Sequence, residues 1–401
     1  MSDIKVKGNI RDILKFVKNI PGRKRWINSG GLDVDGSDKI REFTKELHGG
    51  MVDARIDSIK QETNSTRTYR LRAVDGGRLP FFYAGQYISV KLEIDGRSLT
   101  RPYSISSAPR DVDDAGYLEI TIKKKKAGYV TNYIWDNWKE GTVVRFDGAY
   151  GEFWYQGIRD QKHVVALAGG SGITPFRSIA RDMLSGGRPE KLTILYGVSD
   201  ENDIIFKDEL NELAAKSNGR IKVHYVLSGT SECWEGERGF LCADVIQKLV
   251  GDTAGKSYFV CGPRVMYGYI DKTMQELGII RRFVRREAYG ETDDITLHPA
   301  FPKDRIGKTY RLLLKYGISE VELTCRADET ILVSLERAGY AMDSRCRSGE
   351  CGWCRSYAEK GTVWYPPEME GLRKSDLDEN FIHPCSAYPM SDIVLYVQNQ
   401  L

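Results

Sequence analysis

The stretch Cys346-Arg-Ser-Gly-Glu-Cys351-Gly-Trp-Cys354 brings three cysteines into one short segment near the end of a 401-residue chain. A fourth cysteine, Cys385, follows much later. Clustered thiolates are ligands for zinc or for iron–sulfur clusters. The remaining cysteines have no ligand-like spacing: Cys233, Cys242, Cys261 and Cys325. We therefore begin from a metal centre in the C-terminal part of the chain.

The cysteine spacing favours one kind of centre. Cys-x4-Cys-x2-Cys followed by a distant cysteine is typical of a plant-type [2Fe–2S] cluster. Structural zinc is the alternative, but zinc sites usually pair two short Cys-x-x-Cys knuckles, whereas here one loop supplies three ligands. Gly349 and Gly352 allow backbone N–H groups to turn toward the sulfur atoms. The predicted ligands are Cys346, Cys351, Cys354 and Cys385.

Composition limits the class of protein. The length predicts two to four domains, and 41% hydrophobic with 29% charged residues is ordinary for a globular chain. A net charge of +3 does not argue for a nucleic-acid partner. No apolar run is long enough to span a bilayer, and the N-terminus lacks the apolar core of a signal peptide. We expect a cytoplasmic protein, in which clustered thiols more often hold metal than form disulfides.

The chain divides into segments of different periodicity, and the fold class that we predict is multi-domain. Residues 1–50 contain apolar residues at helical spacing and form a helical N-terminal extension, either docking an acidic partner or packing on its own domain. Residues 51–155 alternate with period two, which predicts a small antiparallel β-barrel with one helix near 130–138. Residues 156–295 alternate strands with helices, which predicts a parallel sheet.

The C-terminal part follows a linker at 296–308. In residues 309–401, two strands form a hairpin around Gly317, a helix follows near 330–338, and the last strand covers 393–397. The cysteine loop lies between that helix and the last strands.

Three polar motifs of the predicted barrel suit a phosphorylated aromatic ligand. Arg101-Pro102-Tyr103-Ser104 offers a planar guanidinium for phosphate, a ring for stacking and a hydroxyl for a ring heteroatom. Gly128-Tyr129-Val130-Thr131 opens a helix whose N–H groups suit a pyrophosphate. A glycine turn at 147–153 follows. An Arg-x-Tyr-Ser segment alone is weak, but the three motifs in this order are specific.

These motifs resemble the flavin-binding barrel of the ferredoxin–NADP⁺ reductase superfamily. The resemblance implies that Arg101 binds the flavin phosphate and that Tyr103 and Ser104 lie against the isoalloxazine ring near N5. The segment from Gly128 to Thr131 resembles the FAD-binding members, so FAD is expected rather than FMN, which relatives of the phthalate dioxygenase reductase type bind. The C-terminal segment resembles the β-grasp fold of plant-type ferredoxins.

The same superfamily carries two further motifs in its nicotinamide nucleotide domain. Gly169-Gly170-Ser171-Gly172-Ile173-Thr174-Pro175 follows an apolar strand and differs from the Gly-x-Gly-x-x-Gly fingerprint. Cys261-Gly262-Pro263 follows a later strand, and the resemblance puts Cys261 close to the nicotinamide ring. The resemblance also implies that Tyr289 covers the flavin. The expected catalytic residues are Ser104, Thr174 and Cys261.

The acidic residues that follow the second strand of the parallel sheet bear on the choice between NADH and NADPH. Asp200 and Glu201 occupy positions where NADP-dependent relatives commonly place basic residues for the 2′-phosphate. Acidic residues there favour NADH. Lys207 and Arg264 lie nearby in sequence and keep NADPH as the alternative.

The resemblance as a whole covers about residues 51–401. It implies an oxidoreductase that takes electrons from NADH through FAD and exports them singly through the cluster to a separate acceptor protein. Two alternatives remain: a self-sufficient flavin reductase for a small substrate, and a redox-sensing regulator. The expected acceptor face is a rim around the cluster, formed by Arg345, Arg347, Ser348 and Trp353. The sequence leaves the acceptor and the oligomeric state open.

Overall fold

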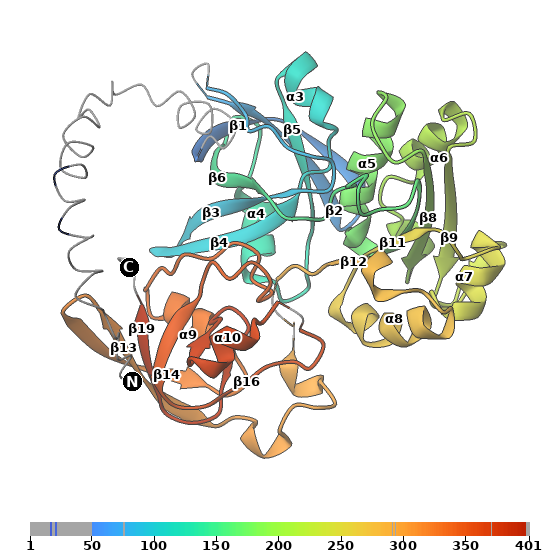
Figure 1. The fold of residues 1–401 in the computed structure, drawn as a ribbon. Coiled ribbons are helices and arrows are strands. Elements are labelled where there is room, and N and C mark those ends of the chain that lie inside the picture. Colours follow the sequence, from blue (N-terminus) through green and yellow to red (C-terminus); the bar gives the residue numbers. More distant parts are fainter. Residues whose placement is uncertain are drawn as a thin grey trace. The chain divides into compact units, whose positions relative to one another are not determined.

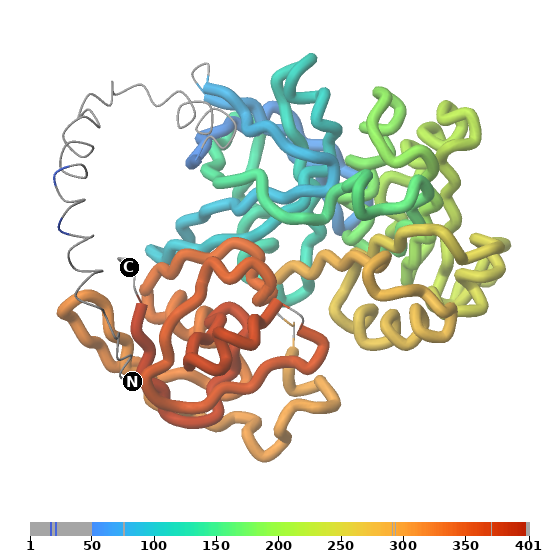
Figure 2. The backbone as a smooth tube through the Cα atoms, viewed as in Figure 1, coloured from blue at the N-terminus to red at the C-terminus, as the bar shows by residue number. Residues whose placement is uncertain are grey.

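The computed structural model describes Val17, Pro21 and residues 50–74, 77–290, 292, 294–369 and 371–397. The helices predicted within residues 1–50 fall almost entirely outside the described residues. In the described residues from 50 onward the chain forms three large successive sheets and one two-stranded pair. Each large sheet occupies one contiguous band of colour in Figure 1, and Figure 2 traces the same backbone as a tube. Within the described part, no helix has both the length and the apolar surface to cross a membrane.

The first sheet is the predicted antiparallel barrel. Its strands are β1 (Met51–Thr63), β2 (Thr66–Ala73), β3 (Tyr87–Ile94), β4 (Arg97–Ser104), β5 (Leu118–Lys123) and β6 (Val143–Tyr150), in the order β4-β3-β6-β1-β2-β5. An antiparallel bridge between Ile105 and Ile120 joins the two ends of this order. Alternate residues of these strands fill one apolar core, which is why period-two patterning found them. Two helices accompany the barrel, α3 (Pro109–Ala115) and α4 (Tyr129–Asn137).

The second sheet is parallel throughout, as predicted. Its strands are β7 (His163–Gly169), β8 (Lys191–Val198), β9 (Ile221–Leu227), β10 (Glu237–Arg238), β11 (Ser257–Cys261) and β12 (Val284–Glu287), in the order β10-β9-β8-β7-β11-β12. Helices α5 (Thr174–Leu184) and α6 (Lys207–Lys216) share one apolar core with the sheet, and α7 (Ala243–Val250) and α8 (Arg264–Glu276) share another. The sheet is therefore covered on both faces.

The third sheet is mixed and contains the cysteine loop. Strands β13 (Thr309–Tyr316) and β14 (Ser319–Arg326) form the predicted hairpin, and β19 (Ile393–Val397) pairs with β13 in parallel. β15 (Ser356–Lys360) and β17 (Phe381–Ile382) complete the order β14-β13-β19-β15-β17, with a separate pair of β16 (Val363–Trp364) and β18 (Tyr388–Pro389). Helix α9 (Ile331–Arg337) packs in this core, and α10 (Lys374–Asp378) precedes β17. This is the expected β-grasp arrangement, with Cys346, Cys351 and Cys354 between α9 and β15 and Cys385 between β17 and β18.

Candidate functional site

The two nicotinamide motifs lie side by side at the carboxyl ends of neighbouring parallel strands. β7 and β11 pair with Ala168 opposite Cys261, so the loops that follow both strands meet at one edge of the sheet. A Cβ atom added to Gly172 would stand 2.1 Å from the carbonyl oxygen of Cys261, and one on Gly169 would stand 2.8 Å from Pro263 Cδ. Both glycines are therefore required by close backbone approach.

The loop also presents open backbone. Gly170 has φ +52° and nothing within 4 Å of the position of a Cβ atom, so a ligand can approach its main chain. Helix α5 begins directly after this loop, and the hydroxyl of Thr174 donates to the carbonyl of Ser171 at 2.9 Å. The first-turn N–H groups of α5 have no partner inside the helix and suit a pyrophosphate. This edge of the sheet fits the nucleotide that the motif implies.

Cys261 lies in this edge as a buried thiol. Its residue is 3% exposed. Burial, with the nearby Glu287 carboxyl, raises the pKa of Cys261 well above the ordinary range. A protonated thiol is a poor nucleophile. Cys261 is therefore suited to neutral contact with a ring and not to covalent catalysis.

The barrel motif on β4 places Ser104 beside a group of buried polar atoms from the second sheet. Ser104 is 6% exposed, and the Tyr289 phenol approaches its side chain. The hydroxyl of Tyr289 and Oε2 of Glu287 are buried and lack a partner with good hydrogen-bond geometry within the described residues, although the Tyr289 phenol lies near both Ser104 and Glu287. Burial is the main cause that raises the pKa of the Glu287 carboxyl well above its usual value. Unpaired buried polar atoms are rare, so they fit a ligand with polar ring atoms, such as a flavin, at this position.

The second barrel motif forms a tight entry into α4. A Cβ atom on Gly128 would stand 2.2 Å from Thr131 Oγ1, so only glycine fits at the helix start. Thr131 Oγ1 donates to the Gly128 carbonyl at 3.3 Å. Val130 is buried in the barrel core, and the hydroxyl of exposed Tyr129 donates to Asp95 at 2.7 Å. The backbone of this turn, more than the side chains of Tyr129 and Val130, is thus available to a pyrophosphate.

Arg101 has a partner that the sequence did not indicate. Its Nη1 donates to the carbonyl of Thr100 at 2.8 Å and lies 3.5 Å from Oε1 of Glu336 in α9. The strand expected to bind flavin phosphate therefore also contacts the ferredoxin-like domain. The local sequence does not predict the pair of Arg101 and Glu336, because these residues lie far apart along the chain.

The predicted cluster ligands come together in the third sheet. The N–H groups of Ser348 and Cys351 donate to Cys346 Sγ at 3.5 and 3.3 Å, and Trp353 N–H donates to Cys351 Sγ at 3.4 Å. Gly349 and Gly352 have φ of +85° and +68°, which turns the loop as expected. Hydrogen bonds from Cys351 and Cys385 are the main cause that lowers the pKa of Cys346 well below the ordinary range.

The four predicted ligands lie near one another. Cys346 lies beside Cys351 and Cys385, and Cys385 also lies beside Cys354. Four neighbouring thiols are the donor set that a [2Fe–2S] cluster takes from a protein. The residues present therefore fit such a cluster.

Gly290 connects the three sites. Its N–H donates to the carbonyl of Cys346 at 3.2 Å, and its own carbonyl accepts from Arg264 Nη2 at 2.9 Å. Tyr289, next to it, meets the buried ring of Tyr87 edge-on at 5.2 Å. The flavin-side residue Tyr289 is thus one residue away from a hydrogen bond to a cluster ligand. The sequence analysis missed Gly290; a glycine directly after the expected flavin-covering tyrosine was the available signal.

The expected exposed rim of the cluster is wrong for two of its four residues. Arg347 is 1% exposed and donates to both carboxylate oxygens of Glu336, at 2.5 and 3.0 Å. Ser348 is also 1% exposed. Arg345 is half-buried, with its guanidinium stacked on Tyr150 and Trp353. Burial of Arg347 is tolerated because Glu336 neutralises its charge.

The rim that remains is smaller. Trp353 is 47% exposed, and Cys351 is the exposed member of the four cysteines. The cluster loop therefore faces solvent through Cys351 and Trp353 and faces the rest of the molecule through Cys346.

Three known domain families match the chain in the order of the three sheets. Residues 53–155 match the oxidoreductase FAD-binding domain, residues 166–272 the oxidoreductase NAD-binding domain, and residues 317–390 the 2Fe-2S iron-sulfur cluster binding domain.

Curated relatives and a solved structure align with all or part of this arrangement. The glycine betaine monooxygenase reductase subunit of Pseudomonas aeruginosa is 28% identical over 356 residues, covering 85% of this chain and 94% of that protein. NADH-cytochrome b5 reductase 1 of Cryptococcus neoformans is 31% identical over 228 residues, covering 54% of this chain and 75% of that protein. The structure of phthalate dioxygenase reductase aligns with a TM-score of 0.64 at 21% identity, covering 87% of this chain and 98% of that one.

Proposed function

Because the chain belongs to the ferredoxin–NADP⁺ reductase superfamily and is an FAD- and NAD(P)H-dependent iron–sulfur oxidoreductase, we propose that it is the reductase component of an oxygenase system. It passes electrons from the nicotinamide through FAD and the [2Fe–2S] cluster to a separate acceptor. Relatives named as reductase components of glycine betaine and 3-ketosteroid monooxygenases support an oxygenase as that acceptor. The observation that carries the proposal is Gly290, where the three sites meet while Cys351 and Trp353 remain exposed.

The side chains have distinct proposed roles. When bound, FAD accepts two electrons as a hydride and releases them singly, which the nicotinamide cannot do. Arg101 and the turn from Gly128 to Thr131 hold its phosphates, Ser104 meets the polar edge of its ring, and Tyr289 covers the ring. The backbone of Gly169–Pro175 holds the nicotinamide nucleotide, and Cys261 keeps water from the reacting faces as a neutral thiol.

We propose NADH as the preferred coenzyme. Asp200 accepts from the N–H of Asn202 at 2.9 Å, and Glu201 accepts from the hydroxyl of Ser231 at 2.8 Å, so both carboxylates are held in place after β8. A 2′-phosphate there meets negative charge. Arg264, the alternative phosphate ligand, is bound to Gly290. A higher kcat/KM with NADPH than with NADH overturns this preference.

The remaining proposals concern organisation. We propose domains at 51–155, 156–295 and 309–401 with a linker at 296–308, and a cytoplasmic location where the cluster thiols stay reduced. Residues 1–50 are proposed to select the acceptor. Their deletion should spare NADH oxidation with ferricyanide and impair transfer to the acceptor; unimpaired transfer contradicts that role.

The test of the function measures where electrons go. Purified protein with FAD and cluster is mixed with NADH, a purified oxygenase component and its substrate, and product is quantified against NADH consumed. NADH-dependent product formation that requires the cluster supports the proposal. Turnover of a small substrate by the chain alone supports the flavin reductase alternative, and negligible steady NADH oxidation with cytochrome c supports the regulator.

A further inference from the structure

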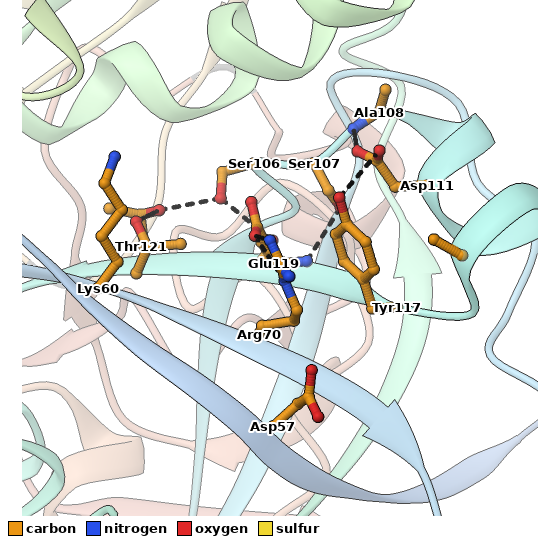
Figure 3. Close-up of polar contacts among 12 residues, drawn as sticks. Asp57, Lys60, Arg70, Ser106, Ser107, Ala108, Asp111, Tyr117, Glu119 and Thr121 are labelled. Atoms are coloured by element: carbon orange, nitrogen blue, oxygen red, sulfur yellow. Dashed lines mark hydrogen bonds and ion pairs between the residues drawn. The ribbon is translucent and has the colours of Figure 1, made fainter. Parts of the chain in front are cut away.

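A buried network of charged side chains joins the barrel to the parallel-sheet domain. Glu119 in β5 and Arg177 in α5 are each 4% exposed, and Arg177 Nη1 donates to Glu119 Oε2 at 2.8 Å. Arg70 donates to the other oxygen of Glu119 from Nε and Nη2, at 3.0 and 2.9 Å. Figure 3 shows Ser106 and Ser107 directly against Glu119, with Arg70 reaching the same carboxylate. This network lies outside the cofactor motifs.

Arg177 binds both domains with one side chain. Besides Glu119, its Nη1 donates to the carbonyl of Ser106 at 3.1 Å, while its Nε donates to Glu209 in α6 at 3.0 Å. The next residue, Ser178, donates from its hydroxyl to the carbonyl of Ser107 at 2.6 Å. Helix α5 therefore donates hydrogen bonds to two successive main-chain carbonyls of the barrel, those of Ser106 and Ser107.

The two residues joined by this contact, Ser106 and Arg177, lie close in sequence to the expected flavin and nicotinamide sites. Ser106 lies two residues after Ser104, which faces the flavin site. Arg177 lies in the first turn of α5, which begins at Thr174 at the end of the nicotinamide loop. The main chain of Ser106 is itself fixed, because its N–H donates to the Glu119 carbonyl at 2.7 Å. The path from nicotinamide loop to flavin strand is thus short and made of ordered groups.

The chemistry of hydride transfer makes this path important. Hydride transfer requires reacting atoms in near contact, and a misplacement of about 1 Å costs roughly a hundredfold in rate. A buried ion network is a poor source of stability compared with apolar packing, because its charges lose their hydration. A guanidinium fork, however, fixes direction as well as distance.

We propose that Arg177 is a positioning residue that sets the nicotinamide loop at the correct distance from the flavin strand. The proposal rests on the proposed hydride transfer from nicotinamide to FAD. It assigns Arg177 no contact with either cofactor; Arg177 acts through Ser106 and through α5.

The kinetic test compares two arginines of the same helix. Arg177→Lys keeps the charge that Glu119 and Glu209 need, so the protein folds, but a lysine cannot make the three directed bonds. The rate of flavin reduction at saturating NADH, measured by stopped flow, should fall between about tenfold and a hundredfold. FAD content and the Kd of NADH should not change. Arg181 binds Asp111 and Glu209 and lies 3.8 Å from Glu119, but it donates to no barrel carbonyl. Arg181→Lys should therefore keep the rate within about twofold.

Two further readouts separate positioning from stability. The charge-transfer absorbance that marks nicotinamide stacked on flavin should weaken in Arg177→Lys and persist in Arg181→Lys. In the FAD-free protein, hydrogen exchange at the Ser106 and Ser107 amides should accelerate in Arg177→Lys alone. An unchanged reduction rate, or a rate loss explained by lost FAD, overturns the proposal. If the unmodified protein fails to reduce FAD with NADH, the proposed function is wrong. The exchange measurement then still tests whether Arg177 fixes the main chain of the barrel at Ser106.

Discussion

The two junctions of the barrel differ in how they are held. Toward the parallel-sheet domain, buried charges and hydroxyls make short bonds, among them Arg177 to Glu119 at 2.8 Å and Thr63 to Asp203 at 2.7 Å. Toward the ferredoxin-like domain, contacts are longer: Arg101 to Glu336 at 3.5 Å and Arg345 to Asp147 at 3.4 Å. Among the residues that the structure describes, the first junction thus contains short buried bonds, and the ion pairs of the second junction are longer.

This difference corresponds to what crosses each junction. A hydride moves only between atoms in near contact, so the first junction must fix position closely. An electron tunnels across a wider gap, so the second junction tolerates small displacements of the cluster. The lengths of these polar contacts are consistent with the positional accuracy that each transfer needs.

The largest expected effect comes from removing the cluster at the second junction. Cys385→Ser deletes a buried ligand, and cytochrome c reduction by NADH should fall by about a hundredfold or more. Ferricyanide reduction, which takes electrons from the flavin, should persist. Cys242→Ser, an exposed cysteine away from the loop, is the control. Equal loss of both activities would show that the cluster is not a separate step.

A second prediction tests the first junction through a buried ion pair of the parallel-sheet domain, whose arginine also reaches the barrel at the Glu152 carbonyl. Arg285 binds both carboxylate oxygens of Asp160, at 2.9 and 2.7 Å, and also donates to the Glu152 carbonyl at 2.7 Å. Asp160→Asn leaves a buried guanidinium without its counter-charge, which should lower the free energy of unfolding by about 3–5 kcal/mol. Urea denaturation measures it. A loss below about 1 kcal/mol, as for an exposed pair, contradicts this account.

A third prediction targets Gly290, where the parallel-sheet domain meets the cluster loop of the ferredoxin-like domain. Its φ of +73° is left-handed, so Gly290→Ala should cost about 1–2 kcal/mol locally and displace the hydrogen bond to Cys346. Electron transfer from flavin to cluster should slow several-fold, with flavin reduction by NADH unchanged. Gly307→Ala has the matched φ of +74° and open space but no contact with the loop. Equal slowing in both variants would assign the effect to strain alone.

The smallest effect is the pH dependence of the first junction. Burial alone would raise the pKa of Asp203, but hydrogen bonds from Lys123, Thr63 and Ser65 hold it below its usual 3.8. The folded protein therefore releases this proton more readily than the unfolded chain. The stabilisation is complete above the unfolded pKa and disappears as pH falls through the folded value.

Because Asp203 is only partly buried, that stabilisation should not exceed about 1 kcal/mol. Thermal unfolding between neutral and acid pH measures it. Asp203→Asn should flatten the acid part of the profile, whereas Asp113→Asn, at an exposed position of α3, should leave it as it is. A parallel shift of the whole profile would mean that Asp203 stabilises the protein through the packing of its side chain and not through its charge.

The sequence predicted what depends on local pattern. Alternation in β3 and the apolar run of β7 identified strands, and cysteine spacing identified the ligands. Helix α3 was missed because its residues include none that is buried, so it carries no apolar periodicity. Arg347 was placed on the surface because its neutralising partner, Glu336, belongs to a different element. Arg177 lay in an expected helix, but its partners are brought to it only by the fold.

The contact between Gly290 and Cys346 joins one main-chain amide to one main-chain carbonyl. No side chain takes part in this bond, whereas Arg101 with Glu336 and Arg345 with Asp147 join the same domain to the barrel through side chains. A ferredoxin module with a different outer surface, and hence a different client, can therefore be seated on the same flavoprotein if it keeps Glu336 and Arg345. In this sense the flavoprotein part is a constant source of electrons, and the ferredoxin module can be exchanged. Grafts that preserve the turn at residue 290 are the natural way to direct the electrons to another acceptor.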